Sequence, residues 1–308
     1  MSTAAVETSN LAKTYRQPLK RRTTQALRGV TVRIERGVIF GLLGQNGAGK
    51  TTFTKILLSL VNPTAGTAQL LGGSPADPAI RRRIGYLPEQ MRIPEYFKAE
   101  NFLRYMADLN GVASATQRAR IPELLELVGL SDKKKMVKAY SKGMQQRLGL
   151  AQTLINNPDL LFLDEPTEGL DPLGRKQVRD LLLKLRSEGK TICLNSHVLS
   201  EVESVCDELL ILNKGEVVRG GKPGELTRTT GEYRLRVAAV TDAVHATVQA
   251  VVGPVRWEGA SATIKPRDRA QLNELIDRLR ALRCEIEAVE PVRLTLEQYF
   301  IRVVSGDE

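Results

Sequence analysis

Short apolar runs alternate along this chain with segments whose apolar residues recur at helical spacing. Residues 38–43, 160–163 and 191–194 are continuous apolar stretches, which predicts three buried strands. A helix is predicted over residues 50–60, directly after the first strand and a Gly-rich turn. Strands that alternate with helices in this way are typical of an α/β fold built on a mostly parallel sheet.

Residues 100–130 interrupt this alternation. Their apolar positions recur at helical spacing, and we expect breaks near Gly111 and Pro122. The pattern therefore predicts a helical insert in the otherwise parallel sheet.

A boundary is predicted near the Gly-Gly-Lys-Pro-Gly sequence at residues 220–224. The pattern beyond it predicts a strand, a helix, a hairpin, a helix and a strand, at residues 233–240, 243–252, 255–264, 269–282 and 284–289. The order β-α-β-β-α-β would suit a small ferredoxin-like α+β domain. We therefore expect a main domain at residues 6–220, a linker at 221–231 and an accessory domain at 232–308.

The composition fits an ordinary α/β protein. A chain of 308 residues, 42% of them hydrophobic, can bury one large core and one small one. It has no run of about 20 apolar residues, so no membrane crossing is predicted, and its start lacks the features of a secretory signal. Three scattered cysteines (Cys193, Cys206 and Cys284) without a CxxC pair indicate buried thiols in a reducing cytoplasm, and no disulfide framework or zinc site.

The net charge of +10 lies in the N-terminal part of the chain. From Gly221 to Glu308, 13 basic residues balance 13 acidic ones, so the excess belongs to the residues before them. It includes basic runs at residues 20–22, 81–83 and 133–135. These runs are either a solvated face or a surface attracted to polyphosphate or anionic lipid. Nucleic acid is not an expected partner, because no aromatic residues interleave with the runs.

The turn after the first predicted strand carries the first chemical signal. It fits the pattern G-x-x-x-x-G-K-T, with the residues Gly44, Gln45, Asn46, Gly47, Ala48, Gly49, Lys50, Thr51 and Thr52. Glycines let backbone N–H groups curl around phosphate oxygens at the positive end of the following helix. Lys50 would reach the β- and γ-phosphates, and the Thr51 hydroxyl would help to hold Mg²⁺. The pattern predicts a P-loop that binds Mg·ATP.

Two carboxylates follow the strand predicted at residues 160–163. A carboxylate at that place on a P-loop sheet can orient the Mg²⁺ shell, which suits Asp164, and its neighbour Glu165 can polarise an attacking water. An apolar strand that ends in Asp-Glu is common by itself, and it indicates a catalytic site here only because the chain also has the Gly-rich turn. His197 follows the strand at residues 191–194, at the end of the strand where α/β sheets collect ligands, which favours a place near the γ-phosphate.

Further motifs resemble those of the ABC ATPases. The sequence YSKGMQQR at residues 140–147 looks like their signature motif, in the YSKGM form often met in exporter ATPases. Residues 168–171, which end in Asp171, resemble the D-loop, and residues 195–197 resemble the switch histidine. Tyr15 stands where this family stacks an aromatic ring on adenine. The resemblance implies a P-loop NTPase core with an antiparallel β subdomain and a helical subdomain.

A composite site is also implied by the resemblance. In this family two ATPase domains pair head to tail, and each nucleotide lies between the P-loop of one domain and the signature of the other. The signature residues are Ser141, Lys142, Gly143 and Met144. Ser141 and Gly143 would donate to the γ-phosphate in trans. With one set of motifs, the chain would form a homodimer or pair with a sister ATPase subunit, and ATP would close the pair.

Three motifs depart from the common form of the family. The signature has Lys142 and Met144 where the commonest form has Gly and Gln, and the D-loop opens with Glu168 instead of Ser. The Q-loop usually reads Tyr-x-Pro-Gln, whereas here Tyr-Leu-Pro is followed by Glu89 and then Gln90. Glu89 is in register with the motif. Either Glu89 or Gln90 would touch Mg²⁺ and the attacking water.

Since no membrane segment is predicted, the chain looks like the separate ATPase subunit of a transporter whose integral-membrane permease is another polypeptide. It would be cytoplasmic and peripheral on the inner face of the cell membrane. In the family, the helical insert and the Q-loop receive a short cytoplasmic helix of the permease. The signature and the tail, which closes with a motif at residues 294–300, most resemble ATPases of drug-, polysaccharide- or lipid-export systems.

The alternative is a soluble ABC ATPase that acts on ribosomes or DNA without a permease. Such relatives generally carry two cassettes in one chain, or a long coiled coil between the P-loop and the signature. This chain has neither feature. For the tail, a regulatory or dimer-bracing role and a passive structural cap both stay open.

Overall fold

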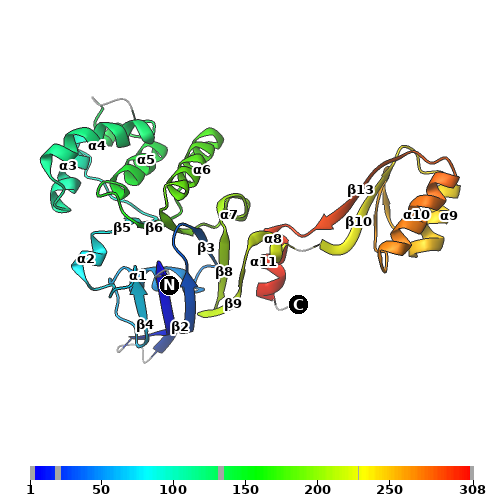
Figure 1. The fold of residues 1–308 in the computed structure, drawn as a ribbon, viewed down its shortest axis with the longest axis horizontal. Helices are drawn as coiled ribbons and strands as arrows, with labels where there is room; N and C mark the ends of the chain where they lie inside the picture. Colours follow the sequence, from blue (N-terminus) through cyan, green and yellow to red (C-terminus); the bar gives the residue numbers. More distant parts are fainter. Residues whose placement is uncertain (1–3, 18–21, 131–134, 228, 306–308) are drawn as a thin grey trace. The chain divides into compact units, whose positions relative to one another are not determined.

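The computed structural model describes residues 4–17, 22–130, 135–227 and 229–305 (Figure 1). Most of the basic runs at residues 20–22 and 133–135 therefore lie outside the described residues. Contacts within the chain divide it into two compact units, Met1–Pro223 and Gly224–Glu308. Each unit has a hydrophobic core of its own.

The first unit is built on a six-stranded sheet of order β5-β6-β7-β3-β8-β9. The strands are β3 (Ile39–Leu43), β5 (Ile84–Leu87), β6 (Leu160–Asp164), β7 (Thr191–Asn195), β8 (Glu208–Asn213) and β9 (Glu216–Gly221). All pairs are parallel except β8 with β9. Every residue of β3, β6 and β7 is buried, as expected for parallel strands that are covered on both faces. The three strands predicted from the apolar runs are confirmed.

A smaller antiparallel sheet of order β2-β1-β4 lies beside the main sheet (Figure 1). It comprises β1 (Val6–Gln17), β2 (Arg22–Ile34) and β4 (Ala65–Leu70). Leu11 and Leu27 from this sheet share a core with Phe53 and Leu57 of α1 (Lys50–Leu57). The small sheet therefore packs against the helix that follows the Gly-rich turn.

The longer helices of the first unit are α3 (Ala99–Leu109), α4 (Ser114–Leu127), α5 (Lys142–Thr153) and α6 (Pro172–Ser187). Shorter ones are α2 (Pro78–Arg81), the 3-10 helix η2 (Val137–Ala139) and α7 (Leu199–Val205), and the boundary between the two units falls within the short helix α8 (Pro223–Leu226). Figure 1 shows α3, α4 and α5 grouped beside β5 and β6, which makes them the predicted helical subdomain.

The predicted break at Gly111 is confirmed, and the one at Pro122 is wrong. Gly111 lies between α3 and α4 with a positive φ of 70°, whereas α4 continues through Pro122. The ring leaves the carbonyl four residues earlier without its helical donor, at a cost of about 3 kcal/mol. Ile121, Leu124 and Leu125 are buried around it, and this packing keeps the segment helical.

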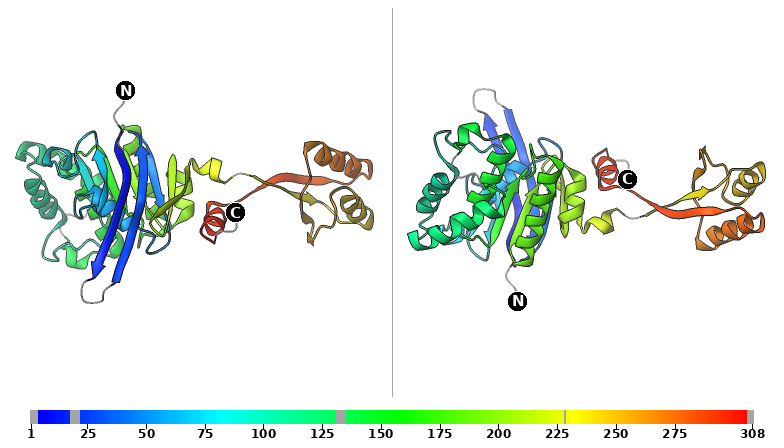
Figure 2. Two further views of the ribbon diagram at one scale, coloured as in Figure 1. Left: turned by 90° about the horizontal axis from the view of Figure 1, so that it is seen from below. Right: turned by 90° about the horizontal axis from the view of Figure 1, so that it is seen from above.

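The second unit contains a four-stranded sheet of order β11-β12-β10-β13 with antiparallel neighbours. Its elements are β10 (Thr229–Val237), α9 (Asp242–Val252), β11 (Trp257–Glu258), β12 (Ser261–Ile264), α10 (Arg269–Ala281), β13 (Ile286–Arg293) and α11 (Leu296–Ser305). In both views of Figure 2, α9 and α10 lie side by side. Leu235 and Val237 of β10 form the core with Val248, Leu275 and Leu279 of these helices.

No helix among the described residues is long and apolar enough to cross a membrane.

Candidate active site

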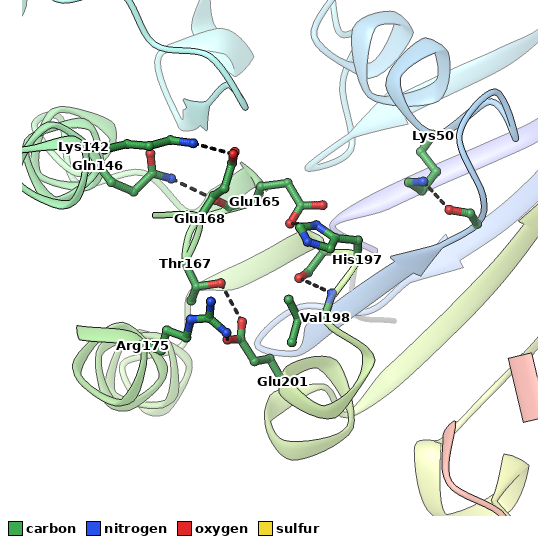
Figure 3. A network of polar contacts seen from close by, with 12 residues as sticks. Lys50, Lys142, Gln146, Glu165, Thr167, Glu168, Arg175, His197, Val198 and Glu201 are labelled. Atoms are coloured by element: carbon green, nitrogen blue, oxygen red, sulfur yellow. Dashed lines mark hydrogen bonds and ion pairs between the residues drawn. The ribbon is translucent and has the colours of Figure 1, made fainter. Parts of the chain in front are cut away.

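The candidate site lies along one edge of the main sheet. In the sheet order β6-β7-β3, the parallel pairing places the last residues of these strands side by side, with Asp164 opposite Asn195 and Leu42 opposite Asn195. Loops that follow parallel strands meet at one edge. The Gly-rich turn, Glu165 and His197 therefore come together there, as predicted from their places in the sequence (Figure 3).

The Gly-rich turn connects β3 to α1 and is too tight to accept side chains at two of its glycines. A Cβ at Gly44 would lie 2.6 Å from the Leu212 carbonyl oxygen, and one at Gly49 would lie 2.6 Å from the Ala26 carbonyl oxygen. Gly49 also has a positive φ of 111°. The first turn of α1, which includes Thr51 and Thr52, has N–H groups without helical partners, so the turn offers donors to an anion.

The Lys50 side chain folds back across the mouth of this turn. Its Nζ donates to the Gly44 carbonyl oxygen, and the Gln45 carbonyl oxygen lies 3.4 Å from it (Figure 3). Burial lowers the pKa of Lys50, and the negative charges of Glu165 and Glu89 oppose that change. A phosphate anion would stabilise the charge of this half-buried ammonium group more strongly than the neutral carbonyl oxygens that hold it.

Asp164 is buried at the end of β6 with both carboxylate oxygens in use. Its Oδ1 accepts from the Asn195 side-chain amide, and its Oδ2 accepts from the Tyr86 hydroxyl at 3.0 Å. Burial raises the pKa of Asp164, and the two hydrogen bonds oppose this. Asn195 also donates to the Thr54 hydroxyl of α1 at 3.1 Å, so one side chain ties the P-loop helix to β6 and β7.

Glu165 has a strained backbone that is held from two sides. Its φ is +50°, the left-handed region, which costs a residue other than Gly about 1 kcal/mol or more. The N–H of Glu165 donates to the Asn195 carbonyl at 2.8 Å, and its carbonyl accepts from the Gln146 side chain at 2.9 Å. These two bonds fix where the carboxylate emerges from the end of β6.

The Glu165 carboxylate faces His197. The His197 Nδ1 and the Glu165 Oε2 are 2.8 Å apart, which is an ion-pair distance when His197 is protonated (Figure 3). Burial raises the pKa of Glu165, and His197 opposes that rise. A carboxylate with a raised pKa is a better proton acceptor than an ordinary surface Glu, which suits a general base.

Of the two Q-loop candidates, Glu89 is the one whose charge reaches the site. Its carboxylate raises the pKa of Asp164 and of Glu165, and it stabilises the protonated form of Lys50. Gln90 is neutral and carries no charge of this kind, so the choice between Glu89 and Gln90 stays a prediction.

The signature residues lie at the N-terminal end of α5. Ser141 is the N-cap, and its Oγ accepts from the Met144 N–H at 3.2 Å. In Figure 3, Lys142 and Gln146 of this segment lie on the opposite side of Glu165 from Lys50. Within one chain the signature and the Gly-rich turn are therefore separate.

The predicted D-loop residue Asp171 is the N-cap of α6. Its Oδ1 accepts from the Gly174 N–H at 2.9 Å. This bond is local to the helix, so Asp171 fixes where α6 begins and where the loop before it ends.

Tyr15, the predicted adenine platform, is on β1 and pairs with Thr24 of β2. Two residues farther along β2, the Ala26 carbonyl packs against Gly49 of the Gly-rich turn. Tyr15 is 38% exposed, and the Lys13 Nζ lies 5.1 Å from the centre of its ring. The ladder thus brings an accessible aromatic residue near the turn.

The oxygen donors at this edge suit Mg²⁺ shared with a nucleotide. Thr51, Asp164 and Glu89 offer hydroxyl and carboxylate oxygens, the hard ligands that Mg²⁺ prefers. In the described part of the chain, no group of three or more His, Cys, Asp or Glu could hold a metal by itself.

The two acidic residues are held by three side chains that carried no predicted role, namely Tyr86, Asn195 and Gln146. All three stand within or beside the quoted motifs, so their positions were visible. Their partners were not, because each bond joins segments that are distant in the sequence.

Comparison with known proteins identifies relatives of this chain. The family model described as "ABC transporter" matches residues 27–168. An uncharacterized ABC transporter ATP-binding protein, all4389 of Nostoc, is 47% identical over 237 residues, 76% of this chain and 71% of the relative. The daunorubicin/doxorubicin resistance ATP-binding protein DrrA of Streptomyces peucetius is 37% identical over 238 residues, 76% of this chain and 70% of the relative.

A solved structure shows the same fold. It is the dimeric ATP-binding cassette MJ0796 in a post-hydrolysis state with ADP and Pi, with a TM-score of 0.64 and 27% identity over 70% of this chain and 98% of that one. The predicted P-loop NTPase fold, with its mostly parallel sheet, antiparallel β subdomain and helical subdomain, is confirmed. With its relatives, its fold and its Gly-rich turn in agreement, the chain belongs to the ABC transporter ATP-binding proteins and is an ATPase.

Proposed function

We propose that this chain is the ATP-hydrolysing subunit of an exporter whose integral-membrane permease is a separate polypeptide. It would lie at the inner face of the cell membrane. The main domain at residues 6–220 would bind and hydrolyse Mg·ATP. Residues 232–308, joined by a linker at 221–231, would form a ferredoxin-like accessory domain, in line with the strand order β11-β12-β10-β13.

The separation of the two motifs supports a head-to-tail pairing of two ATPase domains. In one chain the signature lies across Glu165 from the Gly-rich turn (Figure 3). A nucleotide at Lys50 would therefore receive its signature contacts, Ser141 and Gly143, from a second chain. MJ0796, which has the same fold, is a dimer. The partner would be a second copy of this chain or a sister subunit.

The residues around the nucleotide have distinct roles in this proposal. Lys50 and the turn from Gly44 to Thr52 hold the phosphates, and Thr51 and Asp164 would hold Mg²⁺, which draws charge from the phosphates. Glu165 accepts a proton from the attacking water, and His197 orients Glu165. Glu89 would align the water.

The observation that carries the permease assignment is an exposed aromatic patch, defined here as Tyr96, Phe97 and Tyr105. The ring centres of Tyr96 and Phe97 are 4.8 Å apart, and those of Phe97 and Tyr105 are 5.7 Å apart. Tyr96 is 73% exposed and Tyr105 is 49% exposed. Clustered aromatic residues on a surface mark protein interfaces. The patch begins six residues after Gln90 in the chain, so a helix docked on it could displace the Q-loop.

Replacing Tyr96 and Tyr105 with Ser should weaken permease binding and leave the ATPase rate of the isolated chain unchanged. Aromatic anchors at an interface are often worth 2 kcal/mol or more, so recovery of the permease should fall by about tenfold or more. The measurement is co-purification in mild detergent from the native membrane, with Glu165→Gln and ATP to trap the pair. Leu60→Ser, which changes another exposed apolar residue, is the control.

Recovery of a polytopic membrane protein in near-equal amounts supports the proposed function and gives access to the cargo. Recovery of ribosomes or DNA without a membrane partner contradicts it. Full recovery with the double Tyr variant would place the permease on a surface other than this patch.

Export is the direction favoured by the similarity to DrrA, whose name describes resistance to daunorubicin and doxorubicin. The YSKGM signature at residues 140–144 points the same way. Uptake or efflux of a labelled cargo by vesicles that contain the recovered permease would decide the direction.

The pH dependence of hydrolysis should report the environment of Glu165. Glu165 acts as a base only when ionised, so kcat falls as the pH drops through its pKa. Because burial raises that pKa, the acid limb should lie above the range of an ordinary glutamate. His197 lowers the pKa, so in His197→Ala the limb should move to higher pH. A His245→Ala control should leave the profile in place, since His245 lies in the second unit. An acid limb that His197→Ala leaves in place would contradict the pairing of these two residues.

A further inference from the structure

Two of the positions at which this chain departs from the common family motifs are in contact with each other. Lys142, the variant residue of the signature, is the first residue of α5. Glu168, the variant residue of the D-loop, lies in the loop between β6 and α6. The Lys142 Nζ and the Glu168 Oε1 are 2.5 Å apart (Figure 3). Each variant side chain therefore supplies the counter-charge of the other.

The contact extends along the stem of Lys142. Gly169 has a positive φ of 74°, and a Cβ added there would lie 2.7 Å from Cδ and 2.9 Å from Cγ of Lys142. A Cβ at Gly143 would lie 3.0 Å from Cδ2 of Leu170. At both points the neighbouring side chain lies so close that only glycine fits without a shift. The start of α5 therefore packs closely against residues 168–170.

The same loop is fixed at other points of the chain. The Gln146 side chain donates to the Glu165 carbonyl at 2.9 Å, one turn of α5 after Lys142. On the far side, the Thr167 hydroxyl donates to Oε2 of Glu201 on α7 at 2.6 Å (Figure 3). Residues 165–168 are therefore a firm support against which the start of α5 can be held.

We propose that Glu168 is a positioning residue that acts through Lys142. The ion pair holds the N-terminal end of α5 against the D-loop, so that Ser141 and Gly143 are set for the nucleotide bound by a second chain. This proposal rests on the head-to-tail pairing of the proposed function. The similarity to the signature motif does not provide it, because the common motif has Gly at the position of Lys142.

The expected effect is modest. The Lys142 side chain is 64% exposed and that of Glu168 is 34% exposed, and a pair of this kind changes an equilibrium by about two- to fivefold. A competing role for Lys142 is direct attraction to the γ-phosphate. In that case Glu168 would only screen a useful charge. The two roles predict opposite effects of changing Glu168.

The test measures the ATPase rate of the full chain against ATP concentration. Glu168→Gln should raise KM for ATP about threefold with kcat within about twofold, since the site is less often assembled but its chemistry is intact. Lys142→Gln should raise KM by the same factor, and the double Gln variant should be no worse than either single one. The charge-swapped variant, Lys142→Glu with Glu168→Lys, should return KM toward the wild-type value. Glu100→Gln, which removes the comparable surface pair with Arg104, should change nothing.

Other outcomes overturn the proposal. If Glu168→Gln lowers KM, or if the charge-swapped variant is the worst of the set, Lys142 serves the phosphate directly. If the two Gln changes add fully, the ion pair has no joint role. Ser141→Ala separates this inference from the proposed function. A normal rate and KM in Ser141→Ala would mean that the signature does not act in trans, so the pairing itself would fail.

Discussion

The Glu165→Gln variant should lose about 10³-fold in kcat for ATP hydrolysis while it still binds ATP. General-base catalysis contributes about 10² to 10⁴ in rate, and an amide cannot accept the proton of the attacking water. Gln keeps the size of Glu165, and the Asn195 and Gln146 bonds that hold this position involve only its backbone. The loss should therefore arise from chemistry and not from a displaced loop.

Phosphate release by the purified chain measures kcat, and titration with a fluorescent ATP analogue measures binding. A nucleotide that binds and cannot be hydrolysed keeps the closed state populated. Glu165→Gln should hence elute as a pair in the presence of ATP. Glu203→Gln, an exposed glutamate on α7, is the control and should retain the full rate. A rate within tenfold of the wild type in Glu165→Gln would assign the base to another group, with Glu89 the next candidate.

The elements that the sequence predicted well are those whose whole length is buried. β3, β6 and β7 are fully buried, so every residue in them is apolar or small until the strand ends at the site. The catalytic edge could be predicted for the same reason. Polar residues that directly follow such strands have few places to lie other than the carboxyl edge of the sheet.

The pattern of apolar residues did not predict the antiparallel sheet, which was expected only from the family resemblance. Its strand β1 shifts register between Thr8 and Leu11, where Asn10 has a φ of +48°. A bulge of this kind changes which residues of the strand face the core. The alternation of apolar and polar residues that marks a strand in the sequence is therefore interrupted. The helix α11 (Leu296–Ser305) was also not predicted. Its buried residues Leu296 and Val303 are seven positions apart, which is a helical spacing.

The motifs located the site, but they could not provide its cross-links. The bonds from Tyr86 and Asn195 to Asp164 depend on the sheet order that brings β5, β6 and β7 together, and the bond from Gln146 to Glu165 depends on how α5 packs beside the end of β6. Likewise, a count along the motif does not show that the charge of Glu89 reaches Asp164 and Glu165, which depends on the fold.

Lys50→Met should abolish tight ATP binding and leave the fold intact. Met keeps the length of the side chain and removes the charge. A charge-assisted hydrogen bond to phosphate is worth about 3 kcal/mol in a partly buried site, so affinity should fall by about 100-fold. The matched control is Lys55→Met, because Lys55 lies on the same helix with its side chain exposed. Titration with a fluorescent ATP analogue gives both affinities.

Thermal unfolding without nucleotide shows whether the loss is one of binding or of folding. Burial lowers the pKa of Lys50, which means that the charged form is destabilised where it lies. Removing that charge should leave the unfolding temperature of the nucleotide-free chain unchanged or slightly higher. ATP should then raise the unfolding temperature of the wild type and of Lys55→Met, but not that of Lys50→Met. A large drop in the unfolding temperature of nucleotide-free Lys50→Met would contradict this, since it would mean that Lys50 is needed for the fold of the turn rather than for phosphate.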